Sequence, residues 1–388
     1  MRNLTIFDTT LRDGEQAPGN EMSPETKLAL FRAIDSTGVD YVEAGFPTAS
    51  PTDFEVVREI ARAPRQARVC AFARAVPKDI DRALEALDSQ ANVQLELLLT
   101  GSEIHVHHKR RSTEEAICKE TRDAVAYARS CGVEDIALGY EDATRGSREF
   151  LRRVVELGVQ AGGTTIVLAD TVGCSTPSEI ASLVSATRAW VGDEPKISVH
   201  FHNDLGLALA NTLAAIKSGA DVAQTTFCGI GERAGNAALE ELAAVLHYKA
   251  EEMGATTHLD LRLVREVCDE VCAALGLTPW KHKPVIGRYA FSTAAGVHAS
   301  GLANAPITYQ YVDPELFGRR SETVLNRLSG RANLRIALGE IGLEADDALI
   351  ERMYAAFIVD PNPTRFNARA DFLELYYAAA GEPAGASR

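Results

Sequence analysis

The chain has 388 residues, of which 46% are hydrophobic and 24% are charged, and its formal net charge at pH 7 is -14. This length can bury a core without disulfide staples, and this composition is typical of a globular protein, so a disordered or fibrous chain is excluded. The negative charge argues against a nucleic-acid-binding protein, and no apolar run approaches the length that crosses a bilayer.

The N-terminal segment passes directly into a strand-like run, without the basic, apolar and small-residue zones of a signal peptide. The seven cysteines are scattered and include no CxxC pair. This spacing predicts reduced, mostly buried thiols rather than a disulfide framework or a zinc knuckle. We therefore expect a cytoplasmic protein with no membrane partner.

Eight short β-branched or apolar runs predict strands, and the amphipathic stretches between them predict helices. The predicted strands are Leu4–Asp8, Tyr41–Ala44, Ala67–Phe72, Val93–Leu99, Asp135–Leu138, Thr165–Ala169, Lys196–His202 and Val222–Phe227. Strands that alternate with helices require parallel pairing and right-handed crossovers. Eight such repeats fit a closed α/β barrel of the (β/α)8 type better than an open sheet.

The alternation stops near Lys249, and a segment spaced by proline and glycine follows at about 281–309. From Ser321 to about Ala380 the pattern is helical again. We therefore predict a catalytic barrel at 1–275, followed at 276–388 by a linker arm and a small C-terminal helical subdomain.

Polar residues follow five of the predicted strands, at the end of a barrel where active sites lie. The first strand ends in DTTLRDGEQ, the fifth in GYEDATR, the sixth in DTVGCSTP, the seventh in HFHND and the eighth in GIGERAGN. Helix caps and turns account for Asp8, Thr9, Ser175 and Asp204. They do not account for the remaining polar residues of these five segments. We therefore predict an active site formed by these segments.

A metal site is indicated by His200 and His202, whose side chains lie on the same side of a strand because side chains alternate. Asp13 adds a carboxylate after the first strand, which in a closed barrel lies beside the last ones. This mixed nitrogen and oxygen set suits Mg, Mn, Zn or Co. Asn236 is a further ligand or a hydrogen-bond partner of the ligands.

Two charged residues accompany the metal set. Arg12 is either part of a surface salt bridge or a group that stabilises a developing oxyanion beside the metal. Glu141 is either an ordinary exposed carboxylate or a general base. The basic run at 107–111 could hold a phosphate, although a solvated loop is the simpler interpretation.

At these residues the sequence resembles the acetyl-CoA-dependent 2-oxo acid condensing enzymes of the DRE-TIM metallolyase superfamily, which include 2-isopropylmalate, homocitrate and citramalate synthases. The similar motifs are DTTLRDGEQAPG, YVEAGFP, GYEDATR, DTVG, HFHNDLGLALANTLAAIKSGA and GIGERAGNAALEE, in the order of the family. The resemblance covers residues 4–245 and the arm at 285–318.

The resemblance implies a Claisen condensation of acetyl-CoA with a 2-oxo acid, followed by thioester hydrolysis to a 2-substituted malate and CoA. It implies a divalent ion bound by Asp13, His200 and His202, with Asn236 beside them. It further implies that Arg12 polarises the ketone or the thioester enolate. Thr171 and Glu141 would contact the oxo acid and help to position or deprotonate acetyl-CoA.

The arm sequence AGVHASGLANAPITY matches the family's histidine and tyrosine, here His298 and Tyr309. In the family these residues usually enter the active site of the partner subunit, so the resemblance implies a homodimer with exchanged arms. The alternative for His298 is a structural histidine in a dimer interface.

The identity of the oxo acid depends on residues inside the barrel. Asp13, where lysine-pathway homocitrate synthases commonly have glutamate, and Ala137, where they have arginine, favour the isopropylmalate branch. However, Glu96 and Gly139 replace the histidine and serine typical of that branch. They predict a substrate-binding site for a larger or polar oxo acid, so homocitrate-, citramalate-, phosphonomethylmalate- and benzylmalate-type synthases of secondary metabolism remain alternatives.

Two other classes compete with a synthase. A lyase or aldolase of the same superfamily would run the carbon–carbon chemistry in the cleaving direction, whereas the GIGERAGN segment and the arm favour the synthase. A non-catalytic barrel is the second alternative, against which the intact metal set and Arg12 both argue.

Overall fold

Eight parallel strands close into a barrel, as the alternating pattern predicts. In chain order they are β2 (Thr5–Asp8), β3 (Tyr41–Gly45), β4 (Arg68–Arg74), β5 (Val93–Thr100), β6 (Ile136–Glu141), β7 (Thr165–Asp170), β8 (Lys196–Phe201) and β9 (Val222–Thr225). The first and last strands complete the ring, with Thr5 opposite Val222 and Asp8 opposite Thr225. The computed structural model describes residues 1–88, 91–294, 298, 301–302 and 304–381.

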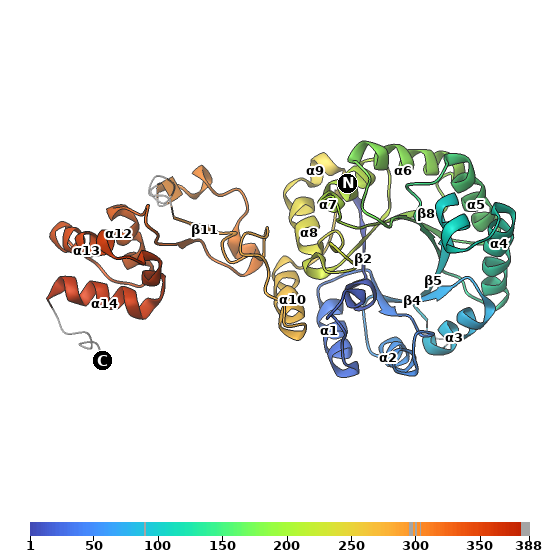
Figure 1. Cartoon of the computed structure of the whole chain (residues 1–388), viewed down its shortest axis with the longest axis horizontal. Helices are drawn as coiled ribbons and strands as arrows, with labels where there is room; N and C mark the ends of the chain where they lie inside the picture. The colour runs from blue at the N-terminus through green and yellow to red at the C-terminus, as the bar shows by residue number, and fades with distance from the viewer. Residues whose placement is uncertain (89–90, 295–297, 299–300, 303, 382–388) are drawn as a thin grey trace. The chain divides into compact units, whose positions relative to one another are not determined.

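A helix follows each barrel strand, and together these helices form the outer ring in Figure 1. They are α1 (Pro24–Ser36), α2 (Pro51–Arg62), α3 (Pro77–Leu87), α4 (Glu114–Ser130), α5 (Arg148–Gln160), α6 (Pro177–Val191), α7 (Ala208–Lys217) and α8 (Leu239–Tyr248). Local sequence fixes several starts: α1 and α2 have proline in the first turn, where a missing N–H is tolerated. The hydroxyls of Ser23 and Ser50 accept hydrogen bonds from first-turn N–H groups.

Two predicted strands end earlier than expected. Strand β8 stops at Phe201, and His202 instead forms an isolated antiparallel bridge with Asn236. Strand β9 stops at Thr225, and residues 227–229 form a short 3-10 turn. Because the chain after β9 folds back over the end of β8, the regular parallel pairing cannot continue there.

Further elements complete the first unit, Met1–Pro279. Strand β1 (Arg2–Asn3) pairs with β10 (Ala255–Thr256), and α9 (Ala250–Met253) and α10 (Leu261–Ala274) follow α8. Helix α10 buries Val264, Val267 and Val271 among other residues. This helix packs against α1 and α8, so the chain beyond the last strand extends the outer layer of the barrel.

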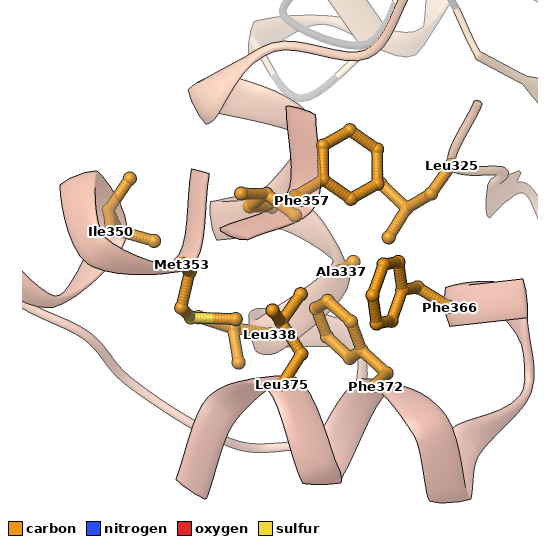
Figure 2. Packing of buried hydrophobic residues seen from close by; sticks show 10 residues of the cluster. Leu325, Ala337, Leu338, Ile350, Met353, Phe357, Phe366, Phe372 and Leu375 are labelled. Carbon is orange, nitrogen blue, oxygen red and sulfur yellow. The ribbon is translucent and has the colours of Figure 1, made fainter. Parts of the chain in front are cut away.

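The second unit, Trp280–Arg388, has its own core. It contains a parallel pair of β11 (Ser292–Thr293) and β12 (Glu322–Thr323), followed by α12 (Arg331–Glu340), α13 (Asp347–Val359) and α14 (Arg369–Ala380). Figure 2 shows side chains of the three helices, of the segment before α12 and of the segment between α13 and α14 packed together. The buried cluster consists of Leu325, Leu334, Ala337, Leu338, Ile350, Met353, Phe357, Phe366, Phe372 and Leu375.

Among the helices in the described part of the chain, none is both long enough and apolar enough to span a bilayer. All seven cysteines are free thiols, and Cys131 and Cys174 are exposed rather than buried. The expectation of mostly buried thiols holds for Cys70, Cys118, Cys268 and Cys272 but not for those two positions, and Cys228 is half-buried.

Candidate metal centre and active-site pocket

A cavity of about 310 Å³ lies at the carboxyl ends of the barrel strands. Many of the residues singled out from the sequence line it together: Arg12, Asp13, Glu96, Gly139, Glu141, Thr171, His200 and His202. They come from segments as far apart as β2 and β8 because parallel strands all present their carboxyl ends at one rim.

Three donor atoms converge on one side of this cavity. Asp13 Oδ2 lies 3.0 Å from His200 Nε2 and 3.7 Å from His202 Nε2, and the two imidazole Nε2 atoms are 3.3 Å apart. The three side chains are buried, and their ligand atoms all lie within 4.8 Å of one another. One carboxylate oxygen and two ring nitrogens in this arrangement fit a divalent cation with open coordination positions.

The protonation states also suit a cation. Burial, and then the neighbouring His200, lower the pKa of His202 to about 4, so this imidazole is neutral at pH 7. Burial alone would raise the pKa of Asp13, but Arg12 and His200 together bring it well below its ordinary value. A neutral imidazole and an ionised carboxylate are the forms that bind metals.

Gln224 on β9 orients one of the imidazoles. The Nε2 of Gln224 donates a hydrogen bond to Glu96 Oε2 at 3.1 Å. The Oε1 of Gln224 lies 3.0 Å from His200 Nδ1 and therefore accepts the N–H of that imidazole. The proton of His200 is thereby held on Nδ1, and the lone pair on Nε2 faces Asp13.

The segment Gly229–Asn236, called the flap below, lies over the metal set. Asn236 Nδ2 donates to the carbonyl of Ile230 at 3.2 Å, while its buried Oδ1 has no hydrogen-bond partner among the described residues. Gly231 has φ of +147°, and a Cβ there would lie 2.2 Å from Asn236 Nδ2. Only glycine allows this approach, which leaves the free amide oxygen of Asn236 available as a ligand or a partner of bound water.

The side chain of Arg12 is only 11% exposed and is doubly paired, so it is not part of a surface salt bridge. Its Nε lies 2.8 Å from Glu43 Oε2, and a terminal nitrogen lies 3.2 Å from Asp13 Oδ2. Its guanidinium also lies over the ring of Phe72, 4.8 Å from the centroid. Burial lowers the pKa of Arg12, but the carboxylates of Glu43 and Asp13 outweigh it and raise that pKa above its ordinary value. A fixed positive charge therefore stands next to the metal set.

Glu141 lies at the pocket wall where β6 ends, with its side chain 22% exposed. Its Oε2 lies 3.2 Å from His105 Nδ1 and also accepts a hydrogen bond from Lys109. The next residue, Asp142, donates its backbone N–H to Thr171 Oγ1 at 2.8 Å. The basic loop after β5 thus positions Glu141, and part of the run at 107–111 has a structural role.

His298 and Tyr309 belong to the second unit. Their ring centroids are 4.2 Å apart, and both side chains are exposed. Several of the residues between them lie outside the described part of the chain. The two residues that the family resemblance selects in the arm therefore form one exposed aromatic pair.

Sequence reasoning missed three residues that shape the site. Glu43 and Gln224 are buried polar residues inside otherwise apolar strands, and this interruption was the signal that could have identified them. Arg233 of the flap donates to Asp204 and to the Thr171 carbonyl, at 2.8 and 2.6 Å. Its position in the GIGERAGN motif gave no indication of these partners.

Two family models match this chain, one in each of its two structural units. The HMGL-like family model matches residues 3–271, and the model described as homocitrate synthase post-HMGL domain-like matches residues 285–359. A 2-isopropylmalate synthase of Methylacidiphilum infernorum is 41% identical over 359 residues, covering 91% of this chain and 71% of that protein. A 2-isopropylmalate synthase of Pyrococcus furiosus is 40% identical, covering 92% and 72%.

Among solved structures, an HMG-CoA lyase from Acinetobacter baumannii in complex with coenzyme A and 3-methylmalate is similar at a TM-score of 0.62. It is 26% identical, and the match covers 72% of this chain and 94% of the lyase. The barrel of this chain is therefore of the same kind as the barrel of that lyase, while its sequence is more similar to the synthases.

Proposed function

Since the chain belongs to the HMGL-like family and, within it, to the 2-isopropylmalate and homocitrate synthase group, we propose that it joins acetyl-CoA to a 2-oxo acid by a Claisen condensation. Hydrolysis of the thioester then releases a 2-substituted malate and CoA. The observation that carries this proposal is the convergence of Asp13, His200 and His202 beside Arg12 in one cavity. The enzyme is an acyltransferase of the class that converts the acyl group into an alkyl group on transfer.

The site residues divide the chemistry among them. Asp13, His200 and His202, with Asn236 beside them, would hold a divalent ion, which when bound would supply Lewis acidity to the ketone of the 2-oxo acid. Arg12 stabilises the negative charge that develops on oxygen, and its pairing with Glu43 keeps it in place before the substrate arrives.

The base must remove a weakly acidic methyl proton from acetyl-CoA. We assign this role, or the positioning of the acetyl group, to Glu141 with Thr171, because both line the cavity. Holding the enolate close to the ketone converts an encounter of two molecules into a step within one complex.

Condensation is favoured over cleavage by the sequence match. The synthases named above match both units of the chain at about 40% identity, whereas the lyase matches about the length of the barrel at 26%. The lyase crystallised with coenzyme A supports a CoA thioester as one substrate of this barrel.

The proposed reaction is tested by free-thiol release from acetyl-CoA in the presence of a panel of 2-oxo acids and a divalent metal. We expect CoA release that depends on both the oxo acid and the metal, and that stops when a chelator is added. Omission of each substrate in turn is the control for simple thioester hydrolysis. Absence of CoA release with every oxo acid, together with cleavage of a hydroxyacyl-CoA, would replace the synthase by a lyase.

We further propose a homodimer in which the arm of one subunit brings His298 and Tyr309 to the active site of its partner. Their exposure, and the exposure of Ile307 and Tyr311 nearby, support an arm surface that requires a covering partner. In this arrangement the two residues activate the water for thioester hydrolysis or shuttle its proton.

Complementation between two inactive variants tests the arm exchange. Asp13→Asn has a defective barrel and an intact arm, whereas His298→Ala has an intact barrel, a defective arm and an unchanged metal content. If arms are exchanged, mixing the two after subunit dissociation gives dimers with one complete site, so activity recovers to about a quarter of wild type by random pairing. Mixtures that dimerise and yet stay inactive would place His298 in its own subunit's site or outside the mechanism.

A cytoplasmic location completes the proposal. Cys228 and Cys272 have sulfur atoms 3.6 Å apart and remain free thiols, as do the other cysteines. Thiols this close stay reduced in a reducing compartment.

A further inference from the structure

We infer that the inner part of the cavity selects a 2-oxo acid whose side chain carries a neutral hydrogen-bonding group, in particular a hydroxyl, and that Glu96 facing Gly139 is the recognition element. This inference rests on the proposed condensation and specifies its substrate class. It concerns the side chain of the oxo acid, whereas the metal set and Arg12 act on its ketone and carboxylate.

Glu96 is a buried carboxylate with one oxygen left open. It lies on β5, only 3% exposed, and it lines the cavity next to Leu98 and Gly139. Its Oε2 accepts the hydrogen bond from Gln224, whereas no described residue donates to its Oε1. Because Glu96 lines the cavity, a substrate that covers Oε1 without pairing with it would leave a carboxylate oxygen buried and unpaired, which is unfavourable, whereas a substrate group that pairs with it avoids this cost.

Gly139 provides the space in front of this oxygen. A Cβ at position 139 would lie 3.0 Å from Glu96 Oε1 and 3.2 Å from the Leu97 carbonyl, so any larger residue would crowd the carboxylate. Gly139 lies on β6, adjacent to β5, and also lines the cavity. The missing side chain therefore leaves room for a substrate atom at the open oxygen.

The apolar side of this region limits the substrate to one polar contact. Leu98 and Val167 line the same cavity and offer only carbon atoms to the substrate. A substrate side chain of a few carbons with one hydrogen-bonding group fits both surfaces.

Charge excludes a second acidic group on the substrate. Arg12 already pairs with Glu43 and Asp13 and is assigned to the ketone oxygen, so it is not available to a second anionic group on the substrate side chain. Burial, and then the carboxylate of Glu43, raise the pKa of Glu96 above its ordinary value, so its neutral form is more favoured than that of an exposed glutamate. A hydroxyl can donate a hydrogen bond to ionised Glu96 and accept one from neutral Glu96. A carboxylate on the substrate would be repelled by ionised Glu96, and an ammonium group would pair only with ionised Glu96.

The test uses two oxo acids of equal size, 4-hydroxy-2-oxobutanoate and 2-oxopentanoate, which differ by a hydroxyl in place of a methyl group. For the wild-type enzyme we expect kcat/KM to be at least about 100-fold higher for the hydroxylated acid, because the apolar acid leaves Glu96 Oε1 unpaired. Glu96→Leu is expected to remove this preference or to reverse it in favour of 2-oxopentanoate. Glu96→Gln, which keeps a polar group of the same size, is expected to retain a preference within about tenfold of wild type.

Two controls separate recognition from general damage. Because Glu96 bonds to Gln224, which in turn bonds to His200, metal content is measured for each variant. Gln94→Leu removes another buried amide of β5, which bonds to Asp135 outside the cavity, and it should leave the preference unchanged.

The outcomes distinguish this inference from the proposed reaction. A wild-type enzyme that releases CoA with 2-oxopentanoate or 2-oxoglutarate in preference to the hydroxylated acid would overturn the inference and leave the condensation intact. The same applies if Glu96→Leu holds its metal and keeps the wild-type preference. No CoA release with any oxo acid would instead count against the condensation itself.

Discussion

Asp13→Asn is expected to reduce CoA release by at least about a thousandfold and to lower the content of bound divalent metal. The asparagine keeps the size of the side chain but removes the negative charge that lies 3.0 Å from His200 and 3.7 Å from His202. A Lewis acid contributes several kcal/mol to such a reaction, and each 1.4 kcal/mol is about tenfold in rate. The loss of the ion therefore removes most of the catalysis.

Metal analysis of the purified variant and steady-state CoA release, with and without added Mg, Mn, Zn or Co, measure this effect. Asp35→Asn is the matched control, since Asp35 is also a buried aspartate but bonds to the backbone N–H groups of Gln66 and Ala67 instead of to the cavity. Full activity of Asp13→Asn, or wild-type activity in excess chelator, would show that the assigned ligands do not carry the reaction.

Arg12→Lys is expected to lower kcat/KM by about 10²- to 10³-fold while metal content stays near that of wild type. A lysine keeps the charge but has one compact ammonium group, so it cannot pair with Glu43 and Asp13 in two directions at once. The oxyanion of the transition state then loses a positioned donor. The partial loss of the buried pair with Glu43 should also lower the free energy of unfolding by about 1–3 kcal/mol.

Steady-state kinetics and chemical denaturation of the same preparation separate these two effects. Arg74→Lys is the control, because Arg74 also pairs with an aspartate, Asp79, but its side chain is 59% exposed and lies outside the cavity lining. A variant Arg12→Lys whose activity falls only in proportion to its unfolded fraction would restrict Arg12 to a structural role.

The sequence by itself determined the barrel fold and the inward orientation of the two metal-binding histidines. The alternation of apolar strands with amphipathic helices leaves parallel pairing as the solution, and the eight repeats close the sheet. The two-residue period of a strand turns both His200 and His202 inward, although the regular strand ends between them at Phe201. These features depend on residues near one another in the chain, so local patterns can predict them.

Only the tertiary structure decided how the site is supported. Glu96 on β5 and Gln224 on β9 are 128 residues apart in the sequence. They meet because both side chains point into the barrel interior. Glu43 meets Arg12, and Lys109 meets Glu141, in the same way, across strands rather than along them. Such pairs depend on how the strands close into a ring and on where each loop folds back over the end of the barrel. Periodic patterns in the sequence predict neither of these. The protonation of Glu96 and the open oxygen beside Gly139 follow from that burial, so they too emerge only once the chain has folded.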